Sequence, residues 1–201
     1  TGLITYMRTD GVQLSSQAIE ELRNEISNRH GKSYIPDNPR VYKSKAANAQ
    51  EAHEAIRPTD IARDPESISS YLDAEQFKLY DLIWKRTISS QMQSAELDET
   101  AADISSKDQS ITFRANGSQV IFPGFFVYRD KEDDRLLPNL KEKEEVDLSK
   151  VESDQHFTQP PPRYTDASLI KKMEELGIGR PSTYASILQV LINRNYVEKE
   201  K

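Results

Sequence analysis

The sequence has no cysteine among its 201 residues, so a disulfide framework and a thiolate zinc site are both excluded. It has no apolar run near the roughly 18 to 20 residues that a helix needs to cross a bilayer. Its few glycines form neither a Walker nor a dinucleotide-binding loop. These absences favour a cytoplasmic protein. Because the chain starts at Thr1, directly on its first motif, we expect it to be part of something larger.

The net charge of −6 ordinarily counts against a nucleic-acid partner, because phosphate binding uses Lys and Arg. The distribution of the charge changes that interpretation. Residues 130–147 carry eight acids and four bases, which is −4 of the −6, whereas residues 155–201 carry seven bases against five acids. DNA or RNA is therefore retained as a partner.

Apolar spacing predicts a mixed α+β chain whose first half is mainly helical. One helix is capped at Ser15 or Ser16 and ended by Gly31, and a second opens with a capping box at Asp73 and Gln76. Two further helices are expected over 166–176 and 183–194, the first capped by Thr165 and ended by Gly177. His30, His156 and Trp84 are interpreted as structural.

After Met92 the apolar period changes toward two, which predicts an antiparallel β segment. We expect strands at 100–105, 110–115 and 119–122, separated by turns at 107–109 and 116–118. A further strand is expected at 144–153 and the first strand of a small hairpin at 195–200. Three consecutive prolines at 160–162 predict a semi-rigid joint between domains.

The first motif is GLITYMRTDG, residues 2–11. In an extended segment Tyr6 and Arg8 share one face, because residues two apart point the same way. Ionising a phenol of pKa near 10 at pH 7 costs roughly 4 kcal/mol, and an adjacent guanidinium offsets part of that cost. This pair suits nucleophilic attack on a phosphodiester. A strand tyrosine making a cation–π or hydrogen-bond contact is the alternative.

The second motif is AQEAHEAIRP. If residues 49–57 are helical, one polar face carries Gln50, His53, Glu54 and Arg57. The spacing fails as a zinc motif because position 57 is not histidine. His53 and Arg57 suit a grip on phosphates or a proton relay, and a solvated helix face is the alternative.

The third motif is GIGRPSTYAS. Its glycines permit a tight turn, Pro181 suits a first helical turn, and Ser182 or Thr183 offers a cap. Arg180 beside the free N–H groups of a helix predicts an anion site; a well-made helix start is the alternative. The helix, turn, helix and hairpin expected here imitate a winged helix-turn-helix.

Together, the three motifs resemble the bacterial type IA DNA topoisomerases, in which GLITYMRTD, QEAHEAIRPTD and GIGRPSTYASI occur in this order. The resemblance covers the whole chain. It implies a multidomain α+β fold that is part of a torus. Residues 1–92 would belong to a helical gate domain with the tyrosine, 93–152 to a β-rich arch, and 153–201 to a winged-helix-like helical domain that binds single-stranded DNA.

The resemblance also implies an activity, which is the ATP-independent relaxation of negatively supercoiled DNA through a 5′-phosphotyrosyl intermediate. Tyr6 would be the nucleophile, Arg8 would position the scissile phosphate, and His53 would assist in the catalytic pocket. DNA contacts are implied for seven further residues, namely Thr5, Thr9, Asp10, Arg57, Arg180, Ser182 and Thr183.

The sequence departs from the family pattern in two respects. Gly11 stands where many members have serine, which removes a hydroxyl and leaves the nucleophile intact. The Toprim domain, which supplies the Mg²⁺ ligands of the family, and the C-terminal zinc ribbons have no counterpart in these residues. We therefore expect a monomeric, nucleoid-associated chain that binds no metal and cannot relax DNA alone.

Two other functions are compatible with the motifs. One is a non-catalytic, winged-helix-like DNA-binding module in which Tyr6 is structural. The other is a tyrosine recombinase, which is disfavoured because that chemistry collects several Arg and His residues from sequence upstream of the tyrosine.

Overall fold

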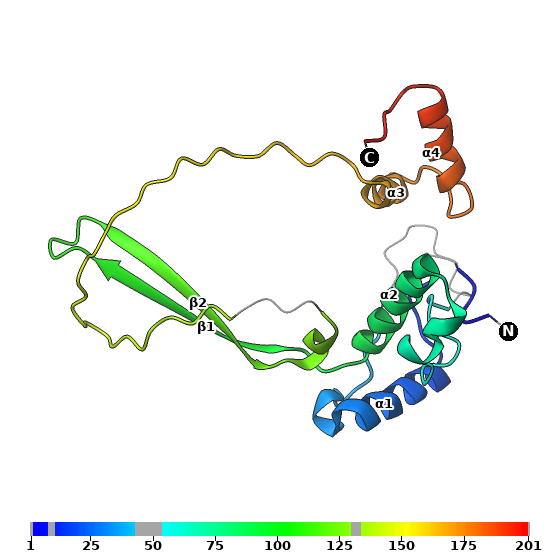
Figure 1. Ribbon diagram of the computed structural model, residues 1–201, viewed down its shortest axis with the longest axis horizontal. Helices are drawn as coiled ribbons and strands as arrows, with labels where there is room; N and C mark the ends of the chain where they lie inside the picture. Colours follow the sequence, from blue (N-terminus) through cyan, green and yellow to red (C-terminus); the bar gives the residue numbers. More distant parts are fainter. Residues whose placement is uncertain (1, 8–10, 43–53, 130–133, 201) are drawn as a thin grey trace. The chain divides into compact units, whose positions relative to one another are not determined.

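The computed structural model describes residues 2–7, 11–42, 54–129 and 134–200. The chain forms two compact units (Figure 1). One unit comprises Ser15–Arg40 and Arg57–Val151, and the other comprises Gly2–Leu14, Val41–Ile56 and Glu152–Lys201. The coarse prediction of mixed helices and antiparallel strands is confirmed.

Helix α1 spans Ser16–His30, as its caps predict. The Ser15 side chain accepts a hydrogen bond from the Ala18 amide, and Gly31 ends the helix with a φ of 90°, which favours glycine. The buried face of α1 consists of Ala18, Leu22 and Ile26. These side chains recur at helical spacing, so one stripe of α1 forms core.

Helix α2 spans Ala74–Ser90 and begins with the predicted capping box. The Asp73 carboxylate accepts from the amides of Glu75 and Gln76, and the Gln76 side chain accepts from the Asp73 amide. The buried residues of the helix are Tyr80, Trp84, Thr87 and Ile88. The Trp84 indole N–H donates to the Ile61 carbonyl at 2.9 Å, so the polar edge of the ring is satisfied inside the core.

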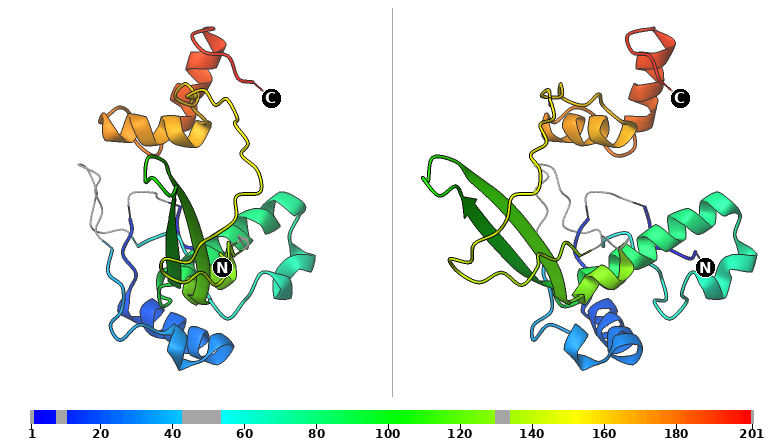
Figure 2. Two further views of the ribbon diagram at one scale, coloured as in Figure 1. Left: turned by 90° about the vertical axis from the view of Figure 1, so that its left-hand side faces the viewer. Right: turned by 60° about the vertical axis from the view of Figure 1, so that its left-hand side comes forward.

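Strands β1 (Glu96–Ser105) and β2 (Thr112–Phe122) form a long antiparallel hairpin. They lie side by side along their length in both views of Figure 2. The predicted turn near 107–109 is confirmed. Its Asp108 carboxylate accepts from the hydroxyls of Ser106 and Ser110, and these hydrogen bonds lower the pKa of Asp108 to about 2.

The predicted turn at 116–118 is wrong, because these residues continue strand β2. Gly117 pairs with Thr100 there. A Cβ on Gly117 would lie 2.8 Å from the Arg135 carbonyl oxygen and 2.9 Å from Leu137 Cγ. The glycine therefore permits the segment around Arg135 to approach β2 closely. Arg135 forms an antiparallel bridge with Ser118 of β2.

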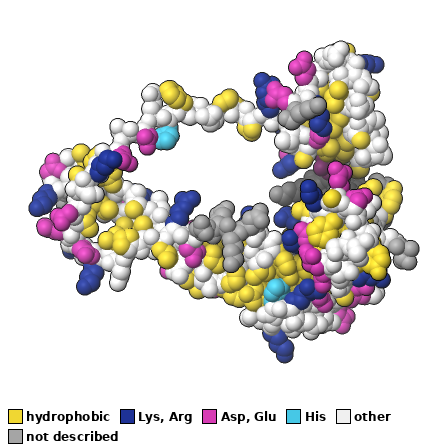
Figure 3. Space-filling model, in the orientation of Figure 1, with side chains coloured by type: hydrophobic (Ala, Val, Ile, Leu, Met, Phe, Trp, Pro, Cys, Tyr) yellow, Lys and Arg dark blue, Asp and Glu magenta, His cyan; other side chains and the backbone are white. Residues whose placement is uncertain are grey.

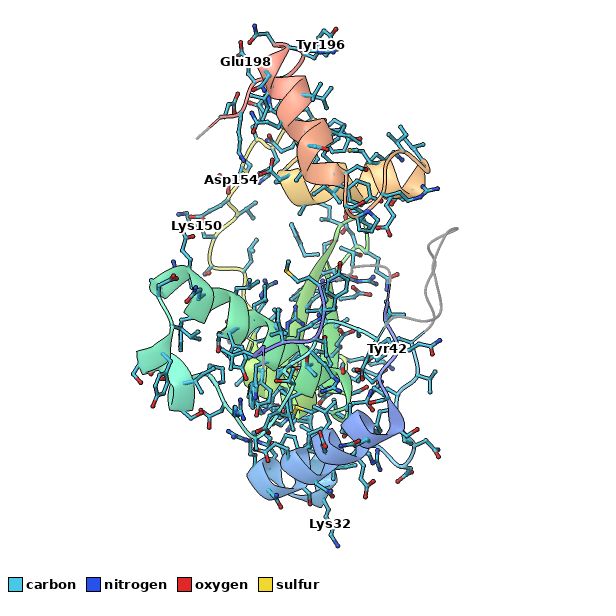
Figure 4. The ribbon with its side chains drawn as sticks, turned by 90° about the vertical axis from the view of Figure 1, so that its right-hand side faces the viewer. Lys32, Tyr42, Lys150, Asp154, Tyr196 and Glu198 are labelled. Atoms are coloured by element: carbon cyan, nitrogen blue, oxygen red, sulfur yellow. The ribbon has the colours of Figure 1, made fainter. Side chains whose placement is uncertain are left out.

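The strand predicted at 144–153 is also wrong. Residues 145–164 carry no regular secondary structure, and no described segment pairs with them as a strand. Figure 4 places Lys150 and Asp154 on this extended stretch. Apolar side chains are exposed along it and on the hairpin, where they are visible in yellow in Figure 3. Residues that alternate between apolar and polar do not form a strand unless another strand is available to pair with them.

A polar junction connects the base of the hairpin to the loop after α1. The Gln91 side chain donates to the Arg40 carbonyl at 3.0 Å and accepts from the Arg40 amide at 3.1 Å. The Arg40 guanidinium donates to the Met92 carbonyl at 2.9 Å and to the Ser94 hydroxyl at 2.7 Å. The 3-10 helix η3 (Gly124–Tyr128) joins the same junction, because the Phe125 amide donates to the Gln93 carbonyl at 3.0 Å.

His30 and Trp84 are structural, as predicted. His30 Nε2 lies 2.6 Å from the Tyr128 hydroxyl, and the Tyr128 ring packs edge-on against Trp84 with the centroids 5.4 Å apart. Burial lowers the pKa of His30, with a further contribution from the Arg29 guanidinium, and burial raises the pKa of Tyr128. Arg29 itself lies over the Trp84 ring at 5.0 Å. These contacts unite α1, α2 and η3 in one core.

Helices α3 (Asp166–Glu175) and α4 (Tyr184–Asn193) follow the proline segment. Thr165 caps α3, as predicted, and its capping-box partner is Ser168. Met173 and Tyr184 are buried. The strand expected at 195–200 is wrong, because these residues form turns and irregular backbone. Figure 4 shows Tyr196 and Glu198 beyond the end of α4.

Candidate functional site

Tyr6 lies in a segment, residues 2–7, that contains no helix and enters a β-bridge at Ile4. The bridge at Ile4 supports the extended backbone supposed for the first motif at that position, whereas residues 5–7 carry no regular secondary structure. The Tyr6 side chain is 78% exposed, so its phenol is open to a reactant from solvent. Arg8, Thr9 and Asp10 lie outside the described residues, and their predicted roles stay predictions.

The backbone on both sides of Tyr6 is held by one residue of the second motif, Ala55. The Thr5 hydroxyl donates to the Ala55 carbonyl at 2.8 Å. The Ala55 amide donates to the Gln13 carbonyl at 2.8 Å, next to a parallel bridge between Gln13 and Glu54. We call this arrangement of Thr5, Gln13 and Ala55 the Ala55 clasp. It brings the first two motifs together.

The helix proposed for residues 49–57 is wrong over its described part. Glu54–Arg57 is non-helical, and Glu54 bridges to Gln13 instead. Pro58 disfavours the α conformation at the residue before it, which gives a local reason. The Arg57 guanidinium donates to the Pro58 carbonyl at 2.8 Å. His53 and Gln50 lie outside the described residues.

The third motif forms the turn between α3 and α4. Gly177 and Gly179 have φ of 70° and 79°, as a tight turn requires. A Cβ on Gly179 would lie 2.9 Å from Ile187 Cδ1, so the turn packs closely on α4. Arg180 is exposed, and its guanidinium donates to the Gly179 carbonyl at 2.9 Å.

The N-terminus of α4 is predicted to be capped by a hydroxyl, but this hydrogen bond is not formed. Thr183 occupies the N-cap position, but its side chain makes no capping hydrogen bond. Its hydroxyl instead accepts from the Arg180 amide at 2.8 Å and donates to the Arg180 carbonyl at 3.1 Å. Pro181 and Ser182 belong to the turn before the helix. Thr183 therefore stabilises the turn that presents Arg180.

The described residues lack the kind of ligand group that a metal ion requires. Over the described ranges, no group of three or more His, Asp or Glu side chains is placed to hold one. The described part of the chain therefore does not fit Mg²⁺. Within the same ranges, no helix is long and apolar enough to cross a membrane.

Sequence reasoning missed the Ala55 clasp. A carbonyl that accepts a hydrogen bond across 50 positions leaves no signature in side-chain spacing, and alanine carries no functional group to attract notice. The only signal for it was the family resemblance, which implied that the first and second motifs share a catalytic pocket. It named no contact between them. Chemically, the clasp presents an exposed phenol on an anchored backbone.

Comparisons with known proteins extend over the whole chain. A sequence profile of the family described as DNA topoisomerase matches residues 1–201. DNA topoisomerase 1 of Rickettsia felis is 54% identical over 207 residues, covering 100% of this chain and 27% of the relative. DNA topoisomerase 1 of Helicobacter pylori is 48% identical over 201 residues, with 100% and 27% covered.

A solved structure agrees with the sequence comparisons. The full-length topoisomerase I from Thermotoga maritima matches with a TM-score of 0.80 and 38% identity, over 98% of this chain and 32% of that one. The chain thus spans about 27% of the length of the curated relatives that it matches. The profile match and these relatives show that the chain belongs to the bacterial DNA topoisomerase I family.

Proposed function

We propose that this chain supplies the tyrosine-bearing part of a type IA DNA topoisomerase that relaxes negatively supercoiled DNA without ATP. Tyr6 Oη attacks a backbone phosphorus of one strand, forming a 5′-phosphotyrosyl bond as the P–O3′ bond breaks. The phenol loses its proton as it attacks, and the leaving oxygen takes up one proton and becomes a 3′-hydroxyl; religation reverses both transfers. After strand passage, that hydroxyl attacks the same phosphorus and releases the tyrosine. ATP is unnecessary because the phosphotyrosyl bond conserves the phosphodiester energy.

The exposed, anchored phenol of Tyr6 is the observation that carries this proposal. Its 78% exposure leaves the oxygen accessible to DNA, and the Ala55 clasp holds the adjacent backbone. A nucleophile needs both access and fixed placement to react efficiently. Family membership supports the same assignment, because the relatives are named DNA topoisomerase 1.

Further residues have supporting roles in this proposal. Arg8 positions the scissile phosphate and stabilises its charge, and His53 assists in the pocket. DNA-contacting side chains are proposed at Thr9, Asp10, Arg57, Arg180 and Ser182. Thr183 supports the contact of Arg180 indirectly, because its hydroxyl proton is donated to the Arg180 carbonyl. The exposed Arg180 guanidinium, on a turn braced by Thr183, supports a contact with the phosphates of a single strand.

The domain assignment is also part of the proposal. Residues 1–92 belong to the gate domain, 93–152 to the arch, and 153–201 to the winged-helix-like domain that binds single-stranded DNA. Mg²⁺ ligands come from parts of the longer enzyme that these residues do not include. We propose that this chain is monomeric and that the intact enzyme acts on DNA in the cytoplasm.

The test compares Tyr6→Phe with Tyr71→Phe in the longer topoisomerase that contains this chain. Tyr71 is 83% exposed, so it is a matched control for loss of an exposed phenol oxygen. We expect Tyr6→Phe to abolish both covalent adducts on a single-stranded oligonucleotide and plasmid relaxation, with Tyr71→Phe retaining both. Adducts that persist in Tyr6→Phe would refute the assignment.

A further inference from the structure

The Ala55 clasp closes a short loop that contains the proposed nucleophile. Thr5 and Gln13 are bonded to the carbonyl and amide of the same residue, each at 2.8 Å. Tyr6 follows the first anchor directly. The second anchor lies two positions before Ser15, the N-cap of α1. Both anchors are thus attached to a single residue, Ala55.

We propose that Thr5 is a positioning residue for Tyr6, which acts through its hydrogen bond to Ala55 and not through contact with DNA. This inference rests on the proposed function of Tyr6. It differs from the family-based expectation, which assigns Thr5 to DNA binding.

The direction of the Thr5 hydroxyl supports a positioning role. The Thr5 side chain is half-buried and bonded to Ala55, whereas the Tyr6 side chain is 78% exposed. Threonine is also stiff at χ1, so one hydrogen bond restrains its backbone well. Fixing Thr5 to Ala55 therefore restrains the backbone next to the exposed phenol.

The number of hydrogen bonds that a threonine can donate distinguishes a positioning role from a DNA contact. A threonine hydroxyl has one proton to donate, and phosphate oxygens only accept. Because the Thr5 proton is donated to the Ala55 carbonyl at 2.8 Å, the hydroxyl cannot donate to a DNA phosphate at the same time. A DNA contact by this hydroxyl would have to open the clasp.

The experiment uses Thr5→Val and Thr5→Ser in the longer topoisomerase. Valine keeps the β-branched shape without the donor, and serine restores the donor. Thr100→Val, at an exposed position of β1, controls for the same chemical change elsewhere. Two quantities are measured with a single-stranded oligonucleotide, namely its Kd and the single-turnover rate of adduct formation at saturating DNA. Deuterium exchange of peptides covering residues 2–14 is measured without DNA.

We expect Thr5→Val to slow adduct formation roughly three- to tenfold, the range that loss of one positioning hydrogen bond gives. The Kd should stay within about twofold, because no direct DNA contact is lost. Exchange over 2–14 should rise. Thr5→Ser should restore both the rate and the protection, and Thr100→Val should change neither. If Thr5→Val does not fold, Thr5→Ala replaces it with the same expectations.

Two results would overturn the positioning role. One is a weaker Kd with an unchanged rate at saturating DNA, which would assign Thr5 to DNA contact. The other is an unchanged rate together with unchanged exchange. Failure of the proposed function is distinguishable, because the parent enzyme would then form no adduct through Tyr6, whereas deuterium exchange reports the clasp without catalysis.

Discussion

At the scale of single residues, Gln91 shows how a buried amide holds two segments together. Its side chain is fully buried and pairs with both the amide and the carbonyl of Arg40, at 3.1 and 3.0 Å. A buried amide must be satisfied inside the protein, because leaving its partners unpaired costs their full desolvation. Gln91 therefore fixes the loop after α1 against the end of α2.

We predict that Gln91→Leu lowers the free energy of unfolding by about 2 to 4 kcal/mol, because two backbone groups of Arg40 lose their partners. Urea unfolding followed by the fluorescence of Trp84, the single tryptophan, measures this change. Gln93→Leu is the control, because Gln93 bonds to Tyr34 and Phe125 through its backbone. A Gln91→Leu protein as stable as the control would contradict this role.

At the level of elements, local signals predicted the capped helices and the turn at 107–109, but not the outcome at 49–57 or at two of the expected strands. Ser15, Asp73 and Thr165 cap their helices as expected, because a cap is decided within three or four residues. The strand at 144–153 failed because pairing depends on an edge elsewhere in the chain. The apparent turn at 116–118 failed because Gly117 serves a close approach instead.

Part of the candidate site could be predicted from the sequence, and part could not. The motifs made Tyr6 a candidate nucleophile, and the family resemblance implied a catalytic pocket shared with the second motif. Neither predicted the helix-free backbone of Glu54–Arg57. The Ala55 clasp and the Gln91 junction join residues about 50 positions apart. Such contacts depend on the folded path of the chain, so no local pattern could reveal them.

Gly124 gives a prediction for the element η3, which follows the hairpin. Its φ is 48°, and a Cβ there would lie 2.5 Å from the carbonyl oxygens of Gln93 and Ser94. Backbone strain and this clash together should make Gly124→Ala destabilising by about 3 kcal/mol or more, as read by Trp84 fluorescence.

Gly177→Ala is the matched control for Gly124→Ala. Gly177 also has a positive φ, of 70°, but a Cβ would meet nothing within 4 Å. It belongs to the other compact unit, so the Trp84 transition should not move. Equal shifts of that transition in the two variants would contradict the packing argument.

At the level of the whole molecule, the chain spans only part of the length of its curated relatives. It covers about 27% of the Rickettsia felis relative, and its described residues hold no metal cluster. We predict that the isolated 201-residue chain does not relax supercoiled plasmid with or without Mg²⁺, whereas the longer enzyme does. A plasmid-relaxation assay resolved on an agarose gel measures this. Relaxation by the pure chain would contradict the prediction.

The central claim is that Tyr6 forms the covalent bond to DNA. The most direct test traps the adduct between the longer topoisomerase and a single-stranded oligonucleotide, digests the protein, and identifies the modified residue by mass spectrometry. We expect a nucleotide phosphate on the peptide that contains Tyr6. A phosphate on any other residue, with an unmodified Tyr6 peptide in the trapped complex, would contradict it.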